Sequence, residues 1–160
     1  MEHTALYIWI KWIHLVATAA WIGGMIANMI IFLPAVRKHL DPGISVKLVG
    51  AVMSRFKILV YGCMAVFVLS GVLLVTMHGT AVGPMRVGDP WFLWFFLKLT
   101  LFVVMVFLAV YSFEVLAPAV GRVAAEGPSG KLKRMQRRQG IMALTGFVLG
   151  LLILLISSIL

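Results

Sequence analysis

The sequence predicts an all-α integral membrane protein folded as a four-helix bundle, and three observations support this. Of the 160 residues, 62% are hydrophobic and 12% are charged, whereas a soluble domain is about half apolar and about a quarter charged. Four apolar stretches each reach the roughly 20 helical residues that cross a bilayer core. The connections are short, which favours an up-down-up-down arrangement in a single domain, residues 1–160.

The four predicted spans follow one another with clear boundary signals. They cover about residues 6–33, 56–77, 91–116 and 141–160. Pro34 is expected to stop the first span, and Pro118 lies just beyond the third, because proline disrupts a helix interior. After the first span, Asp41 can cap a new helix and Pro42 can occupy its first turn. The residues up to Arg55 are therefore either an interfacial amphipathic turn or an inner extension of span two.

Basic residues are concentrated in two of the three connections, which predicts the orientation. The first connection holds Arg37, Lys38, Lys47 and Arg55, with Lys57 at its edge, and the third holds Arg122, Lys131, Lys133, Arg134, Arg137 and Arg138. The second holds only Arg86, offset by Asp89. The positive-inside rule then predicts a multi-pass protein of the inner (plasma) membrane with both termini outside. The net charge of +9 fits anionic lipid headgroups better than nucleic acid.

Four tryptophans agree with this orientation. Trp9, Trp12, Trp91 and Trp94 all fall near the predicted outer face. Tryptophan is enriched where membrane meets water, so these residues are expected to form an aromatic belt. This signal does not depend on the count of basic residues.

Span one contains two basic residues that hydrocarbon does not favour, Lys11 and His14. They are three residues apart, so on a helix they share one face. An ionisable residue inside a membrane span is costly and is by default a candidate functional site. His14 lies about eight residues into the span, roughly 12 Å below its outer end. We therefore expect His14 to act as a ligand or to handle protons.

Two further polar groups are expected to meet His14 in the outer half of the bundle. Lys98 lies roughly 10 Å from the outer end of span three, and His78 ends span two at the outer rim. Imidazole is a common axial ligand of haem iron, and a bundle core often holds the macrocycle. His14 is the expected axial ligand, and His78 or Lys98 is the expected second ligand. Lys11 and Lys98 would suit the anionic haem propionates.

The face of span one below His14 carries mostly small residues at helical spacing. They are Ala17, Thr18, Trp21, Gly24, Met25 and Asn28. Trp21 and Gly24 are candidate cofactor-binding residues on this face. Its small members, such as Gly24, would let a flat ring approach. Small residues in membrane helices also permit close helix packing, and an asparagine there commonly bonds to a neighbouring helix. Both interpretations of this face are open.

Copper is the alternative to haem. Thioether and imidazole groups suit Cu(I), and the chain has ten methionines. Met77 adjoins His78, and Met85 lies nearby, so a copper site would use His14 and His78 with neighbouring methionines. Methionine is also an ordinary apolar filler. A third hypothesis is a small membrane subunit whose polar residues organise only helix packing or a partner interface.

The remaining polar and reactive residues predict structure rather than chemistry. Tyr111 and Glu114 share a face of span three and are expected to pair with Arg137 or Arg138 as an anchor. Cys63 lies in an apolar run, which predicts a packing role. No Ser-His-Asp, paired-carboxylate or phosphate-binding glycine pattern occurs, which leaves no basis for hydrolase or phosphotransferase chemistry.

Three pieces of sequence, in order, resemble the CopD-like and HemJ-like membrane protein superfamily. Residues 11–24, KWIHLVATAAWIGG, resemble its first span, in which a histidine is followed seven residues later by tryptophan and then by glycine. Arg55-Phe56 followed by Ser70-Gly71 looks like the second span of the copper resistance D domain, and Trp91 with Lys98-Leu99 looks like the third span of both groups.

The two groups imply different functions. Resemblance to the HemJ group implies b-type haem and a role in oxidising protoporphyrinogen IX, with the essential histidine and lysine at His14 and Lys98. Resemblance to the CopD group implies copper handling at the inner membrane. We expect a cytochrome b-like protein with an electron-transfer or redox role, haem in the outer half of the bundle, and an unidentified redox partner. Copper binding or transport is the alternative, and enzyme activity and homo-oligomer formation stay open.

Overall fold

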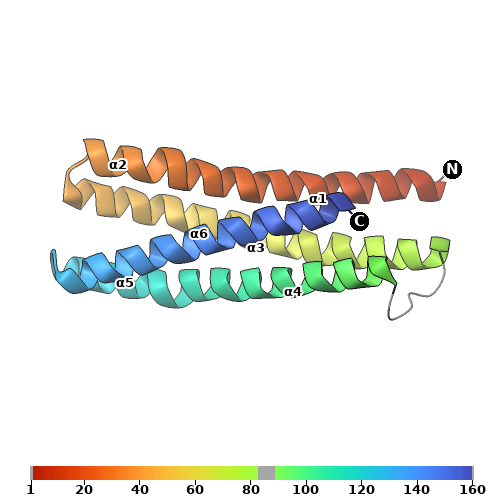
Figure 1. Ribbon diagram of the computed structural model, residues 1–160. Helices are drawn as coiled ribbons and strands as arrows, with labels where there is room; N and C mark the ends of the chain where they lie inside the picture. The colour runs from red at the N-terminus through yellow and green to blue at the C-terminus, as the bar shows by residue number, and fades with distance from the viewer. Residues whose placement is uncertain (1, 83–88, 160) are drawn as a thin grey trace.

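The computed structural model describes residues 2–82 and 89–159, which are helical and contain no strand (Figure 1). The elements are α1 (Glu2–Ile26), the π-helix η1 (Ala27–Phe32), α2 (Leu33–His39), α3 (Pro42–Val82), α4 (Pro90–Val110), the π-helix η2 (Tyr111–Leu116), α5 (Ala117–Ala125) and α6 (Gly130–Ile159). Four stretches within these helices are long and apolar enough to cross a membrane: Ala5–Val36, Gly43–Met77, Pro90–Ala125 and Gly130–Ile159. The prediction of a multi-pass helical membrane protein is therefore supported.

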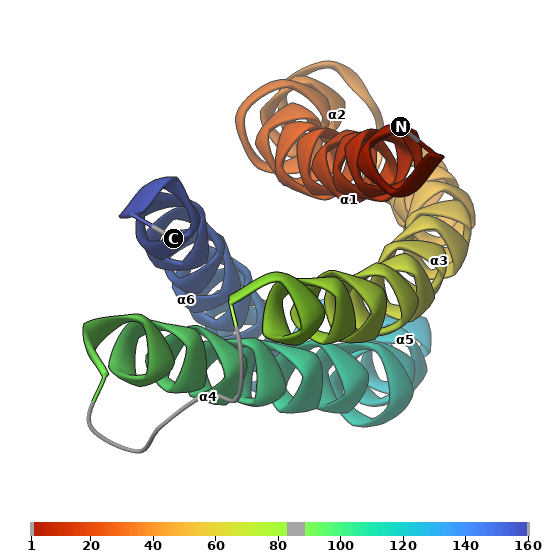
Figure 2. The same cartoon turned by 90° about the vertical axis from the view of Figure 1, so that its right-hand side faces the viewer.

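The four long helical segments lie lengthwise beside one another, and both termini lie toward one end, called here the terminal end (Figure 1). The opposite end, where α2 meets α3 and α5 meets α6, is called the connecting end. Viewed from the terminal end, α1 and α4 lie on opposite sides of the molecule (Figure 2). α1 packs against α3, and α4 packs against α6.

The segment after Asp41 is a helical extension of the second span rather than a separate amphipathic turn. α3 begins at Pro42 and runs without interruption for 41 residues. At 1.5 Å per residue it is about 60 Å long, about twice the thickness of a bilayer core. α6 likewise begins at Gly130, so the basic residues before Ile141 belong to the same helix as span four. Both helices therefore carry basic side chains beyond their apolar parts at the connecting end.

Pro34 does not stop the first span, contrary to the sequence prediction. The helix continues through Pro34 to His39 as α2, and the segment before it widens into η1. Pro118 follows η2 in the same way and lies within α5. A proline ring clashes with the carbonyl four residues earlier, which is Ile30 for the first and Glu114 for the second. Both carbonyls lie inside a π-helix, so the wider turn accommodates the proline and the helix continues.

The two halves of the chain repeat this pattern at a constant separation of 84 residues. η1 and η2 begin at residues 27 and 111, and the prolines stand at 34 and 118. Each half is a long helix with a π-helix before its proline, followed by a second long helix that returns toward the terminal end (Figure 1). The sequence gives little sign of this repeat, because the apolar residues at equivalent positions differ.

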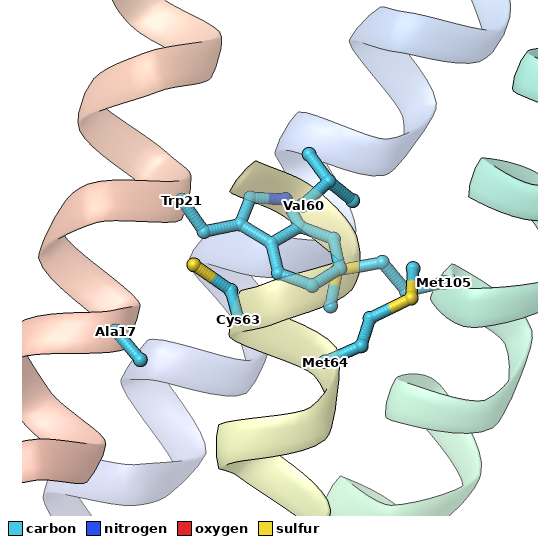
Figure 3. Packing of buried hydrophobic residues seen from close by; sticks show 6 residues of the cluster. All are labelled: Ala17, Trp21, Val60, Cys63, Met64 and Met105. Atoms are coloured by element: carbon cyan, nitrogen blue, oxygen red, sulfur yellow. The ribbon is translucent and has the colours of Figure 1, made fainter. Parts of the chain in front are cut away.

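A small apolar core joins α1, α3 and α4 near the middle of the molecule. Its buried members are Ala17, Trp21, Val60, Cys63, Met64 and Met105 (Figure 3). Figure 3 shows the Trp21 side chain reaching from α1 into the centre of this cluster. Cys63 is buried within it, so the predicted packing role is confirmed. Many other large apolar side chains are exposed, consistent with contact between the helices and lipid.

Candidate functional site

The His14 side chain is fixed by a hydrogen bond that connects α1 to α3. Its Nδ1 atom lies 2.7 Å from the Ser70 hydroxyl oxygen. Ser70 is the buried polar residue of the described chain, with 4% of its surface exposed. Sequence reasoning used Ser70 only as part of a family resemblance and did not place it at the site. The sequence signal that could have identified Ser70 is its position in an apolar stretch with few other polar residues.

The hydrogen-bond pattern around Ser70 determines which nitrogen of His14 carries the proton. A serine hydroxyl has one hydrogen to donate. Ser70 donates it to the Val66 carbonyl of its own helix, so toward His14 the oxygen offers only lone pairs. The Nδ1–H of His14 is therefore the donor, and in the neutral ring Nε2 carries the free lone pair. A hydrogen bond of this kind orients histidines that ligate metals.

The Nε2 atom of His14 is accessible rather than enclosed. Nε2 makes no hydrogen bond to any residue that the structure describes. Within the same residues, no buried side-chain nitrogen or oxygen lacks a partner. Since a fully enclosed Nε2 would be such an atom, Nε2 is at least partly exposed.

Aromatic rings form a packed layer beside His14 on the side toward the core. The Phe67 ring centroid lies 5.1 Å from that of His14 and 5.6 Å from that of Trp21. Phe102 of α4 packs against Phe67 edge-to-face at 5.9 Å. This layer connects α1, α3 and α4 and shields the core from the His14 site. Trp21 thus lies beneath the site and contributes to the core.

Lys98 occupies the position in the second half of the chain that His14 occupies in the first. The two are separated by the same 84 residues (14 to 98) that separate the two π-helices. The Lys98 side chain is half-buried. Lys98 belongs to α4 and His14 to α1, two helices on opposite sides of the molecule (Figure 2). No hydrogen bond joins the two side chains.

No contact joins Lys11 or Gly24 to the His14 or Ser70 side chain among the described residues. Lys11 is exposed, and its ammonium lies 6.0 Å from the centre of the Tyr7 ring. Gly24 faces Phe56 of α3, where an added Cβ would lie 2.8 Å from the ring. Close helix packing is therefore the role that the structure gives Gly24. Asn28 donates to the Gly24 carbonyl of its own helix rather than to a neighbouring helix.

His78 lies near the C-terminal end of α3, but its side chain is outside the described part of the structure. Its role as second ligand, either of haem or of copper, therefore stays a prediction. Among the described residues, no three side chains of His, Cys, Asp or Glu come together as a metal-binding group.

Glu114 is anchored by α3 rather than by the arginines of α6. Its Oε1 accepts a hydrogen bond from the Tyr61 hydroxyl at 2.6 Å and lies 2.7 Å from the Lys57 ammonium. The expected pairing with Arg137 or Arg138 is therefore wrong for Glu114, because the Lys57 side chain projects across the α3/η2 contact. The expectation holds for Tyr111, whose ring lies 6.0 Å from the Arg138 guanidinium.

A groove lies between α3 and α4 on a different face of α3 from His14. It has a volume of about 510 Å³ and is lined by Met64, Ala65, Val68, Leu69, Phe102, Val103, Val106 and Phe107. Phe67 and Ser70 face His14, whereas Val68 and Leu69 line this groove. The groove and the His14 site are therefore separate, although Phe102 contacts both the aromatic layer and the groove.

Comparisons with known protein families, with curated protein sequences and with solved structures found no match to this chain.

Proposed function

We propose that this chain is a b-type haem protein of the membrane in which His14 Nε2 is an axial ligand of the iron. The observation that carries the proposal is the His14–Ser70 hydrogen bond, which fixes the ring and leaves the Nε2 lone pair open. A histidine that served only to pack helices would need no such free nitrogen. A bound haem would supply one-electron redox chemistry.

The residues near His14 fit a haem in their chemistry. Ser70 orients the ligand ring, and α4 supplies a half-buried cation, Lys98. The propionates of a haem are anionic and gain from such a charge. The packed layer of Trp21 and Phe67 closes the side toward the core. A ring bound to His14 would therefore lie on the terminal-end side of this layer.

The orientation is part of the same proposal. The basic residues of α2, α3, α5 and α6 gather at the connecting end. By the positive-inside rule this end faces the cytoplasm, and the terminal end faces outward. Trp9, Trp12 and Trp94 are exposed at the terminal end, where an interfacial belt would place them. The His14 site then lies in the outer half of an inner (plasma) membrane.

The test is a reduced-minus-oxidised absorbance spectrum of protein purified from cells supplied with haem. The wild type should give Soret and α bands, and His14→Ala should lose them. His39→Ala is the matched control, because His39 is an exposed histidine at the connecting end. Absence of both bands from the wild type would refute the proposal. Copper retained in place of haem, measured by elemental analysis, would favour the alternative copper site at His14 and His78.

A further inference from the structure

Beyond the lining of the α3/α4 groove, toward the connecting end, there is a polar bridge formed by Lys57, Tyr61 and Glu114. Tyr61 precedes Met64 and Ala65 by three and four residues, so it lies on the same face of α3 one turn away. Its hydroxyl donates to Glu114, which belongs to η2 directly after α4. The polar bridge therefore connects the same two helices that form the walls of the groove.

The polar bridge is partly exposed. The Lys57 and Glu114 side chains retain 35% and 45% of their surface exposed. Both the Lys57 ammonium and the Tyr61 hydroxyl reach the same carboxylate oxygen, Oε1. The ammonium has three hydrogens and the carboxylate has a second oxygen, so both groups keep capacity for another partner. The cluster thus offers hydrogen-bond donors and an acceptor at one end of an apolar groove.

The lining of the groove favours a flat ring with an apolar tail. All eight lining side chains are apolar, and they include the rings of Phe102 and Phe107 and the thioether of Met64. Aromatic and thioether groups pack well against a planar ring. The volume of about 510 Å³ lies within the range of small-molecule sites, roughly 300 to 1,000 Å³.

We propose that the α3/α4 groove binds a membrane quinone, with a ring carbonyl at the polar bridge and the isoprenoid tail along the groove. A quinone carbonyl is an acceptor, which complements the Lys57 ammonium, because the Tyr61 hydroxyl already donates its one hydrogen to Glu114. The choice of quinone among ring-bearing lipophiles rests on the proposed haem function, because a membrane haem protein needs an electron partner that dissolves in lipid. The existence of the groove and of its polar end does not rest on that function.

The test measures binding of decylubiquinone to the full chain in phosphatidylcholine nanodiscs, with empty nanodiscs as the reference for partitioning. Binding should saturate at about one quinone per chain. Ala65→Phe fills the groove and should weaken binding about tenfold or more, which equals about 1.4 kcal/mol. Ala19→Phe is the matched control, since Ala19 is exposed on α1 outside the groove, and it should bind as the wild type does. Lys57→Met removes the ammonium and should weaken binding about fivefold, the scale of one hydrogen bond.

Several results would overturn the quinone site. Binding that never saturates above the empty nanodiscs would do so, as would equal binding by the Ala65→Phe and Ala19→Phe proteins. A tightly held phospholipid that only Ala65→Phe releases, and that quinone does not displace, would assign the groove to a lipid chain. A change of oligomeric mass in Ala65→Phe alone would assign it to a second copy of the chain.

The same titration separates this proposal from the haem proposal. His14→Ala leaves the groove untouched, so it should bind decylubiquinone normally while it loses the haem bands. Conversely, Ala65→Phe should retain those bands. Haem bands without quinone binding would overturn only the groove, and quinone binding without haem bands would overturn only the haem site.

Discussion

At the scale of single residues, the central feature is that Ser70 makes His14 a directed ligand. Histidine alone in a membrane helix has two tautomers and no fixed rotamer. The Ser70 oxygen, already used as a donor to Val66, accepts from Nδ1 and thereby selects the tautomer with a free Nε2. Burial of Ser70 keeps this hydrogen bond away from competing water.

Removing this hydroxyl should weaken haem binding without removing the ligand. Ser70→Ala is expected to lower haem affinity about 10- to 100-fold, the usual effect of losing an orienting partner of a metal ligand. The measurement is a haem titration of the apoprotein followed by the Soret absorbance. Ser157→Ala is the matched control, because Ser157 makes the same bond to its own helix, at Ile153, but lies far from His14 in the sequence. Equal affinities for the two variants would show that Ser70 does not position the ring.

At the scale of helices, α1 and α3 approach each other through glycine and aromatic side chains. Gly24 provides room for the Phe56 ring, and Phe56 in turn packs edge-to-face against Phe113 at 6.2 Å. Membrane helices lack a hydrophobic driving force for association, so such close contacts hold them together. The α1–α3 contact also sets the distance between His14 and Ser70.

A paired substitution at neighbouring glycines tests this contact. Gly24→Ala places a methyl group 2.8 Å from the Phe56 ring and should destabilise the protein by about 1 to 3 kcal/mol, as overpacking does. Gly23→Ala meets nothing within 4 Å, so it should leave stability unchanged or raise it slightly through better helix propensity. Thermal unfolding in detergent measures both. A Gly24→Ala protein as stable as Gly23→Ala would contradict the close packing.

The π-helices are the second feature at this scale. Each lies just before a proline, and Glu114 of the polar bridge belongs to η2. A π-turn leaves a local mismatch in the backbone hydrogen bonds, and such turns are frequent at functional sites. In η1, the Asn28 side chain donates a hydrogen bond to the Gly24 carbonyl, close to the point where the α-helical backbone hydrogen bonds give way to those of the π-helix. The positions of the two prolines in the sequence predict that the helices end there. The sequence does not indicate that a wider π-turn before each proline makes room for its ring, so that the helix continues.

At the scale of the whole molecule, charge is distributed unequally between the two ends. The connecting end carries most of the lysines and arginines, and the terminal end carries the exposed tryptophans. This asymmetry supports the proposed orientation in the membrane. It also places the His14 site and the polar bridge toward opposite sides of the bilayer.

Cysteine labelling tests the orientation. In intact cells, Asp89→Cys should react with a membrane-impermeant maleimide, because residue 89 lies in the predicted outer connection. Ser129→Cys, between α5 and α6, should react only after the cells are opened. The native Cys63 is buried and should give no background. The reverse pattern would invert the proposed orientation.

The sequence alone predicts the membrane-spanning helices of this protein and the unusual ionisable residues within them. The length and composition of four apolar stretches determine that they are helices suited to lipid, because lipid leaves the backbone no other hydrogen-bond partners. An ionisable residue in such a stretch is costly wherever it faces, so His14 was recognisable as exceptional. Lys98 was recognisable for the same reason.

Only the tertiary structure decided which side chains meet. The spans are apolar nearly all round, so no amphipathic pattern specifies how each helix is rotated about its axis. The partner of His14 is 56 residues away, and Glu114 pairs with Lys57 rather than with Arg137 or Arg138. These contacts depend on helix rotation and on the close approach at Gly24. The sequence thus determined the helices and the unusual histidine, and packing decided that Ser70 orients it.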